Sequence, residues 1–130
     1  MAKFCSSIVL DAAATVIRDR GAKMAVCTSN AITTVDHVET YTLAVTTMTT
    51  GAGSTSYTIA DGDVSGRKIT ISAQASIAVA TTGVAQQICI YTTIGTTMLI
   101  YKTDATTQAL ASTANKVTIP AWKIEFRDAT

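Results

Sequence analysis

Few residues of this chain have the type and spacing that acid–base catalysis needs. His37 is the only histidine, and Asp36 and Glu39 lie beside it in the segment DHVE. A carboxylate that orients a histidine makes a general base, but this spacing along the chain is not specific for that arrangement. No serine lies in a nucleophile-elbow pattern, and no cysteine lies in a catalytic motif. We therefore interpret His37 as a surface loop residue and expect no catalytic residue and no enzymatic activity.

The segment DGDVSG at residues 61–66 resembles the first half of a calcium-binding loop. Its matches to loop positions 1, 3, 5 and 6 are Asp61, Asp63, Ser65 and Gly66. The twelfth position, which needs a bidentate glutamate, is Ser72, and Arg67 and Lys68 place two cations beside the site. Asp and Gly are also typical turn residues, so we predict a tight β-turn, with a weak ion site as the alternative. Gly51 and Gly53 lack the third glycine of a dinucleotide motif, and we expect no metal and no cofactor.

Three residues are candidate contacts to a partner. Trp122 is the only tryptophan, and tryptophan side chains often anchor interfaces. A partly buried core position is the alternative for Trp122. Arg67 and Lys68 are adjacent cations that directly follow the predicted turn. These three residues are our candidates for a binding surface.

The composition narrows the class of protein. A chain of 130 residues fits one domain with a substantial core. Hydrophobic residues make up 48% and the mean hydropathy is +0.32, yet charges interrupt every apolar run before the ~18 residues of a membrane span. The formal net charge is +1, so no basic field is available for nucleic acid. Asp11 interrupts the apolar N-terminal stretch, so we expect neither a secretory signal nor a membrane partner.

The cysteines Cys5, Cys27 and Cys89 are odd in number, far apart and set in apolar surroundings. No C-x-x-C pair is present. We predict buried free thiols, which indicate folding in a reducing cytoplasm.

Residues 7–20 form the one predicted helix. Ser7 is a suitable cap, and Gly21 follows where a C-terminal glycine belongs. One face carries apolar residues, namely Leu10, Ala13, Ala14 and Ile17. We expect the helix to cover one end or face of a sheet, with a docking helix as the alternative.

The rest of the chain has the pattern of strands and turns. Threonine is the commonest residue, and its branched Cβ favours strands. A hairpin is predicted with its turn at residues 93–96, a polar loop at 29–34 and a flexible loop at 51–56. We predict a mainly β fold, an antiparallel β-sandwich with a jelly-roll-like winding and one N-terminal α-helix. The expected single domain spans residues 1–130, with the helix at about 7–20 and the β region at about 23–126. The predicted strands cover residues 23–28, 40–49, 57–59, 68–75, 76–80, 85–92, 97–102, 106–111 and 116–126.

Two segments carry a family resemblance: YTIADGDVSGRKITI at residues 57–71 and NKVTIPAWKIEFRDAT at residues 115–130. With the helix-then-strand beginning, they resemble small virion structural proteins of tailed bacteriophages. Capsid decoration, or cement, proteins are the most similar in size and in Thr/Ala-rich β character. The resemblance implies a homodimer or homotrimer that binds the outside of the phage major capsid protein shell and stabilises it. It also implies assembly in the host cytoplasm, and it supplies no catalytic residues.

Two other functions stay open. A head–tail completion protein or another tail structural protein would share this composition and differ only in location. A glycan-binding β-sandwich would need aromatic side chains that stack on sugars. The aromatic candidates are few and spread over different predicted strands, namely Tyr41, Tyr57, Tyr91, Tyr101 and Trp122.

Overall fold

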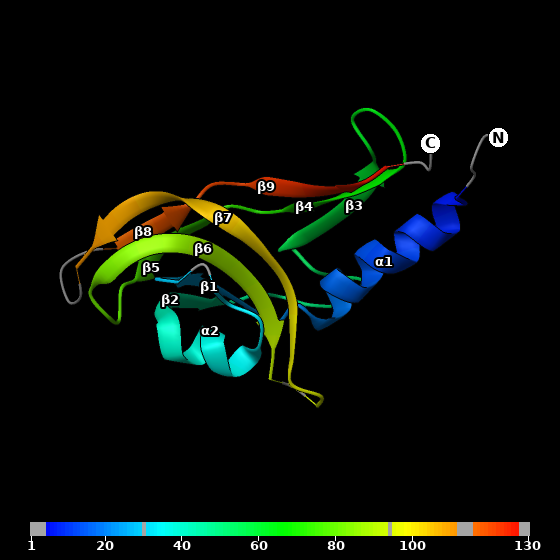
Figure 1. Cartoon of the computed structure of the whole chain (residues 1–130). Coiled ribbons are helices and arrows are strands. Elements are labelled where there is room, and N and C mark those ends of the chain that lie inside the picture. Colours follow the sequence, from blue (N-terminus) through cyan, green and yellow to red (C-terminus); the bar gives the residue numbers. More distant parts are fainter. Residues whose placement is uncertain (1–4, 30, 94, 112–115, 128–130) are drawn as a thin grey trace.

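The computed structural model describes residues 5–29, 31–93, 95–111 and 116–127. In these ranges an N-terminal helix precedes a mainly β fold, as predicted from the sequence (Figure 1). Ile94, in the predicted hairpin turn, lies outside the described residues. The elements are α1 (Ser7–Arg20), β1 (Lys23–Cys27), α2 (Val35–Tyr41), β2 (Thr42–Thr47), β3 (Tyr57–Asp61), β4 (Arg67–Ile71), β5 (Gln74–Ala78), β6 (Gly83–Thr92), β7 (Met98–Leu110), β8 (Lys116–Ile119) and β9 (Trp122–Phe126).

The described strands form three antiparallel sheets. Their orders are β2-β1-β6-β7, β3-β4-β9 and β5-β8. The four-stranded sheet lies on one side of a common core, and the β3-β4-β9 sheet lies on the other (Figure 1). This is a sandwich-like arrangement. The strand orders do not by themselves give a jelly-roll winding, which stays a prediction.

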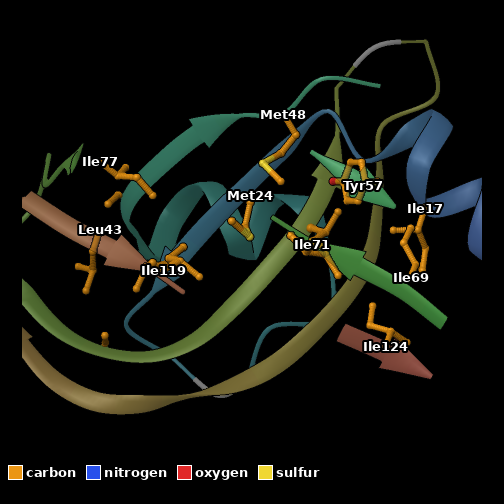
Figure 2. Packing of buried hydrophobic residues seen from close by; sticks show 14 of the residues in the cluster. Ile17, Met24, Leu43, Met48, Tyr57, Ile69, Ile71, Ile77, Ile119 and Ile124 are labelled. Carbon is orange, nitrogen blue, oxygen red and sulfur yellow. The ribbon is translucent and has the colours of Figure 1, made fainter. Parts of the chain in front are cut away.

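The main core is built mostly from aliphatic side chains of all three sheets, with Tyr57 among them (Figure 2). Met24 comes from β1, Ile69 and Ile71 from β4, and Ile77 and Ile119 from β5 and β8. Branched residues project well from a pleated strand, so the many isoleucines suit a core with few rings. A second apolar cluster lies on the opposite face of the four-stranded sheet. It is covered by α2 and comprises Ala25, Cys27, Ile32, Val35, Val38, Cys89 and Tyr91.

Helix α1 begins and ends close to the predicted bounds. Ser6, and not Ser7, is the N-cap, and its side chain accepts a hydrogen bond from the Ile8 N–H at 3.3 Å. Gly21 follows the helix, and its N–H donates to the Ile17 carbonyl at 2.8 Å. Ala13 is exposed, contrary to the sequence prediction, because the buried stripe is narrower and consists of Leu10, Ala14 and Ile17. The opposite side of α1 faces solvent.

The β6–β7 hairpin is confirmed, and β7 is longer than predicted. It runs without interruption from Met98 to Leu110, so residues 106–111 do not form a separate strand. Two irregularities in its pairing with β6, between Ala85 and Gln87 and between Ile90 and Tyr91, accommodate the curvature of this long ribbon. β7 is therefore an outer strand that bends over the core (Figure 1).

Helix α2 is a correction to the sequence analysis, which predicted a loop at His37 and a strand beginning at residue 40. Thr34 caps the helix, since its hydroxyl accepts a hydrogen bond from the His37 N–H at 3.3 Å. Val35 and Val38 face the sheet, and burial of these two side chains holds a helix of only two turns in place. His37 is thus an exposed helix residue.

Candidate interaction surfaces

The predicted turn at residues 61–66 joins β3 to β4, and ion pairs fasten it to α1. The Arg67 Nε lies 2.5 Å from Asp11 Oδ1 on the helix, and another guanidinium nitrogen pairs with Asp61. The hydrogen bond to Asp11 is the main cause that raises the pKa of Arg67 above its ordinary value. Arg67 therefore links a helix to a sheet, and its charge is used within the molecule.

Lys68 takes part in a second set of ion pairs, which fastens the same turn to β9. Its Nζ lies 2.6 Å from Asp63 Oδ1, and Lys123 of β9 pairs with the other oxygen of that carboxylate. Glu125, also on β9, accepts a hydrogen bond from the Val64 N–H at 3.0 Å. The geometry is that of a turn held by side chains from the neighbouring strand.

This arrangement bears directly on the calcium alternative. Both carboxylates of the DGD segment, Asp61 and Asp63, already face cationic side chains. Among the described residues, no three His, Cys, Asp or Glu side chains gather where they could hold a metal ion. The geometry favours the turn interpretation over the ion site.

Trp122 lines a hollow at the other end of β9. Its ring contacts Tyr101 of β7, with ring centroids 5.9 Å apart. The hollow has a volume of about 290 Å³ and adjoins a second of about 330 Å³ between β7 and β8. We call the first one the Trp122 hollow. Its lining consists of Ile88, Thr103, Asp104, Ile119, Pro120, Trp122 and Lys123.

The indole nitrogen of Trp122 has an unusual environment. Nε1 is buried, and no acceptor for its N–H is found in the part of the chain that the structure describes. Buried N–H donors are almost always paired, and an unpaired one costs about 1–3 kcal/mol. The hollow therefore combines aromatic surface, a lysine and an aspartate beside the outer strand β7. The unpaired indole N–H lies beneath this surface.

The structure separates the three candidate contact residues. Along the β4–β9 pairing, Arg67 lies opposite Phe126 and Lys68 opposite Glu125, whereas Trp122 lies opposite Ile71. Four residues of strand span about 13 Å. The two cations begin β4 directly after the turn, and Trp122 belongs to a different surface.

A further surface was missed by the sequence analysis, namely the outward side of α1. Ile8, Val9 and Val16 are 77%, 59% and 47% exposed, and Ala12 and Ala13 between them are also exposed. We call these five residues the outer face of α1. The signal was present in the sequence, because apolar residues occupy both sides of this helix and only one stripe can face the core.

His37 and the cysteines form no common site. The His37 Nδ1 accepts a hydrogen bond from the Thr33 N–H at 3.3 Å. Cys27 and Cys89 are fully buried free thiols as predicted, whereas Cys5 is half-buried. A hydrogen bond between the two buried thiols lowers the pKa of Cys27 and raises that of Cys89. Burial of both sulfurs limits their access to reagents.

Comparisons with protein-family models, curated proteins and solved structures find no match for this chain. Neither described helix has the length and hydropathy that a membrane span requires.

Proposed function

We propose that this protein is a virion structural protein, a capsid decoration or cement protein that binds the outside of a phage major capsid shell and stabilises it. The Trp122 hollow is the observation that carries the proposal. A partly exposed tryptophan in a hollow beside an outer strand has the character of an interface anchor. The two segments that resemble phage virion proteins support it, since one of them contains Trp122.

In this proposal the protein assembles in the host cytoplasm and is then located on the capsid exterior. A shell segment that enters the hollow would bury the exposed part of the indole against Pro120. Arg67 and Lys68 are no longer proposed as the main contacts, because their charges are neutralised within the molecule.

The test is binding to mature shells prepared without this protein, measured by co-sedimentation over a range of concentrations. Trp122→Ala is expected to weaken binding at least about tenfold. Trp122→Phe, which keeps a smaller aromatic ring, is expected to give an intermediate loss. Tyr41→Ala is the matched control, because Tyr41 is 40% exposed on α2, away from β9.

Circular dichroism and thermal melts would establish that each variant is folded. Full binding by folded Trp122→Ala, or no binding by the wild-type protein, would overturn the assignment. Imaging of the intact particle at low resolution would then separate a capsid position from the alternative of a head–tail completion or tail structural protein.

A glycan-binding module is a second candidate, and one observation favours it. The aromatic residues are spread along the sequence, yet the fold brings Tyr101 and Trp122 together at the hollow. Stacked or adjacent rings with nearby polar groups can hold a sugar. Reproducible hits on a glycan array that Trp122→Ala abolishes would support this function over shell binding.

A further inference from the structure

The outer face of α1 has a regular spacing. Val9 and Val16 are seven residues apart, so they lie at nearly the same angle around the helix, and Ala12 and Ala13 lie between them. Leu10, Ala14 and Ile17 on the other side are already buried in the molecule. The apolar stripe on the outer face therefore has no partner within the described part of the chain.

We infer that this stripe packs in an antiparallel manner against the same stripe of a second copy of the chain, across a two-fold axis. The stripe is self-complementary about the midpoint between Ala12 and Ala13. An antiparallel copy places Val9 against Val16 of the partner subunit and Ala12 against Ala13 of the partner subunit. The alanines permit helix axes to approach to about 8 Å, while the valines fill the space on each side.

The charges on α1 favour the antiparallel direction. The last turn of α1 contains Arg18, Asp19 and Arg20, and Arg18 pairs with Asp19 at 2.9 Å. Arg20 lies eleven residues after Val9 and therefore at nearly the same angle around the helix, so a parallel pair would bring the Arg20 side chains of two copies together, which is unfavourable. An antiparallel pair separates them by about 20 Å, the length of a 14-residue helix, and places opposite ends of the helix dipoles side by side.

The area of the stripe sets the expected strength of the contact. A helix of this length presents a face about 21 Å long and 10 Å wide, which is well below the ~800 Å² per partner of a standard stable interface. The contact is therefore a weak dimer in dilute solution. On an assembled particle the high local concentration of bound copies makes such a contact effective.

This inference deepens the proposed function, in which the protein associates with itself, but it does not depend on shell binding. The primary test is sedimentation equilibrium of the full chain over a concentration series. We expect a monomer–dimer equilibrium in the micromolar to millimolar range, which Val9→Glu and Val16→Lys each weaken at least tenfold. The double variant Val9→Glu/Val16→Lys is expected to regain the wild-type constant within about threefold, because the introduced carboxylate of one copy then faces the introduced ammonium group of the other.

Val84→Glu is the control, because Val84 is 40% exposed at the start of β6, outside the outer face of α1. It should leave the equilibrium unchanged. A wild-type protein that stays monomeric at millimolar concentration, a trimer, or a folded double variant that does not regain association would each overturn the two-fold contact.

Cross-linking tests the direction of the helices independently. In a Cys5→Ser background, Ala12→Cys lies beside the proposed axis and should form a disulfide-linked dimer under mild oxidation. Arg20→Cys lies at the far end of the helix and should not form this dimer. A parallel pair of helices would instead cross-link through Arg20→Cys as readily as through Ala12→Cys. A dimer without shell binding would reject only the proposed function, and shell binding by a monomer would reject only this inference.

Discussion

At the scale of single residues, the charged side chains near the β3–β4 turn bind one another. Asp63 pairs with lysines from two strands, and Glu125 accepts the Val64 N–H while its second oxygen lies 3.2 Å from the Arg127 Nε. Such exposed pairs each contribute little to the free energy of unfolding. Together they fix the position of a turn that has few apolar contacts of its own.

Glu125 gives this network a predictable pH dependence. The Val64 N–H is the main cause that lowers the pKa of Glu125 below its ordinary value of 4.5, and Arg127 adds to the effect. The ionised form therefore stabilises the folded state. That contribution is complete above the ordinary pKa and is lost as the pH falls through the lower pKa of the folded protein.

We expect Glu125→Gln to reduce the slope of unfolding free energy against pH in this acidic range. Urea unfolding from about pH 6 to about pH 3 would measure it. Glu39→Gln on α2, which changes the same residue type without touching the turn, is the variant for comparison. Identical slopes for Glu125→Gln and the wild-type protein would contradict this role of the carboxylate.

The sequence predicts the turn itself but not the residues that hold it. Asp and Gly in the segment DGDVSG have local conformational preferences that favour a chain reversal. The partners of the turn come from elsewhere: Arg67 meets Asp11, 56 positions away, and Asp63 meets Lys123. Contacts of this kind depend on which strands become neighbours, and one sequence carries no local signal for that.

At the scale of secondary structure elements, local signals predicted α1 and the β6–β7 hairpin well. The bounds of α1, the glycine that follows it and the pairing of β6 with β7 are as predicted, although Ser6 caps the helix and Ala13 is exposed. Local signals did not predict α2, because a seven-residue helix has too few turns for a periodic pattern. This helix is stabilised by packing of Val35 and Val38 on the sheet. Local signals also failed for the extent of β7, whose polar second half is paired along β6.

Gly66 links the turn to β9 by close approach of the two backbones. Its φ is +70°, and a Cβ at this position would lie 1.9 Å from the Phe126 carbonyl oxygen. Gly95, in the β6–β7 turn, has nearly the same φ of +69° and no atom within 4 Å of a Cβ. The two glycines therefore separate the cost of backbone conformation from the cost of a steric clash.

We expect Gly95→Ala to lower the free energy of unfolding by about 1 kcal/mol, the cost of a left-handed conformation for alanine. Gly66→Ala should cost about 2–4 kcal/mol more, because either the turn or the end of β9 must move. Urea denaturation of both variants would measure the difference. Equal losses would show that the turn shifts freely and that its attachment to β9 is weak.

At the scale of the whole molecule, the two apolar surfaces lie at different places on the fold. The outer face of α1 belongs to a helix that is joined to the start of β4 by the Asp11–Arg67 pair. Trp122 lies at the other end of the β4–β9 ladder. Under the two proposals, a second copy at α1 and a shell at the Trp122 hollow would therefore not compete for the same surface.

The proposed function then predicts an order of particle stabilities. Two weak contacts made at once raise the effective concentration of each, so a dimer bound at both hollows bridges neighbouring shell subunits more strongly than a monomer does. Val9→Glu should still bind shells but stabilise them less than the wild-type protein. Trp122→Ala, which lacks the anchor, should stabilise them least.

Heating particles while genome release is followed tests this order directly. Particles lacking the protein would be supplemented with saturating amounts of wild-type protein, Val9→Glu, Trp122→Ala or the Val84→Glu control. We expect the highest release temperature for particles with the wild-type protein or the Val84→Glu control and a lower one with Val9→Glu. Particles with Trp122→Ala and unsupplemented particles should release the genome at the lowest temperature. Initial shell assembly should be affected less, because in the proposed function the protein adds to a shell that has already formed. Equal release temperatures with and without the wild-type protein would exclude a cement function and leave the description of the fold unchanged.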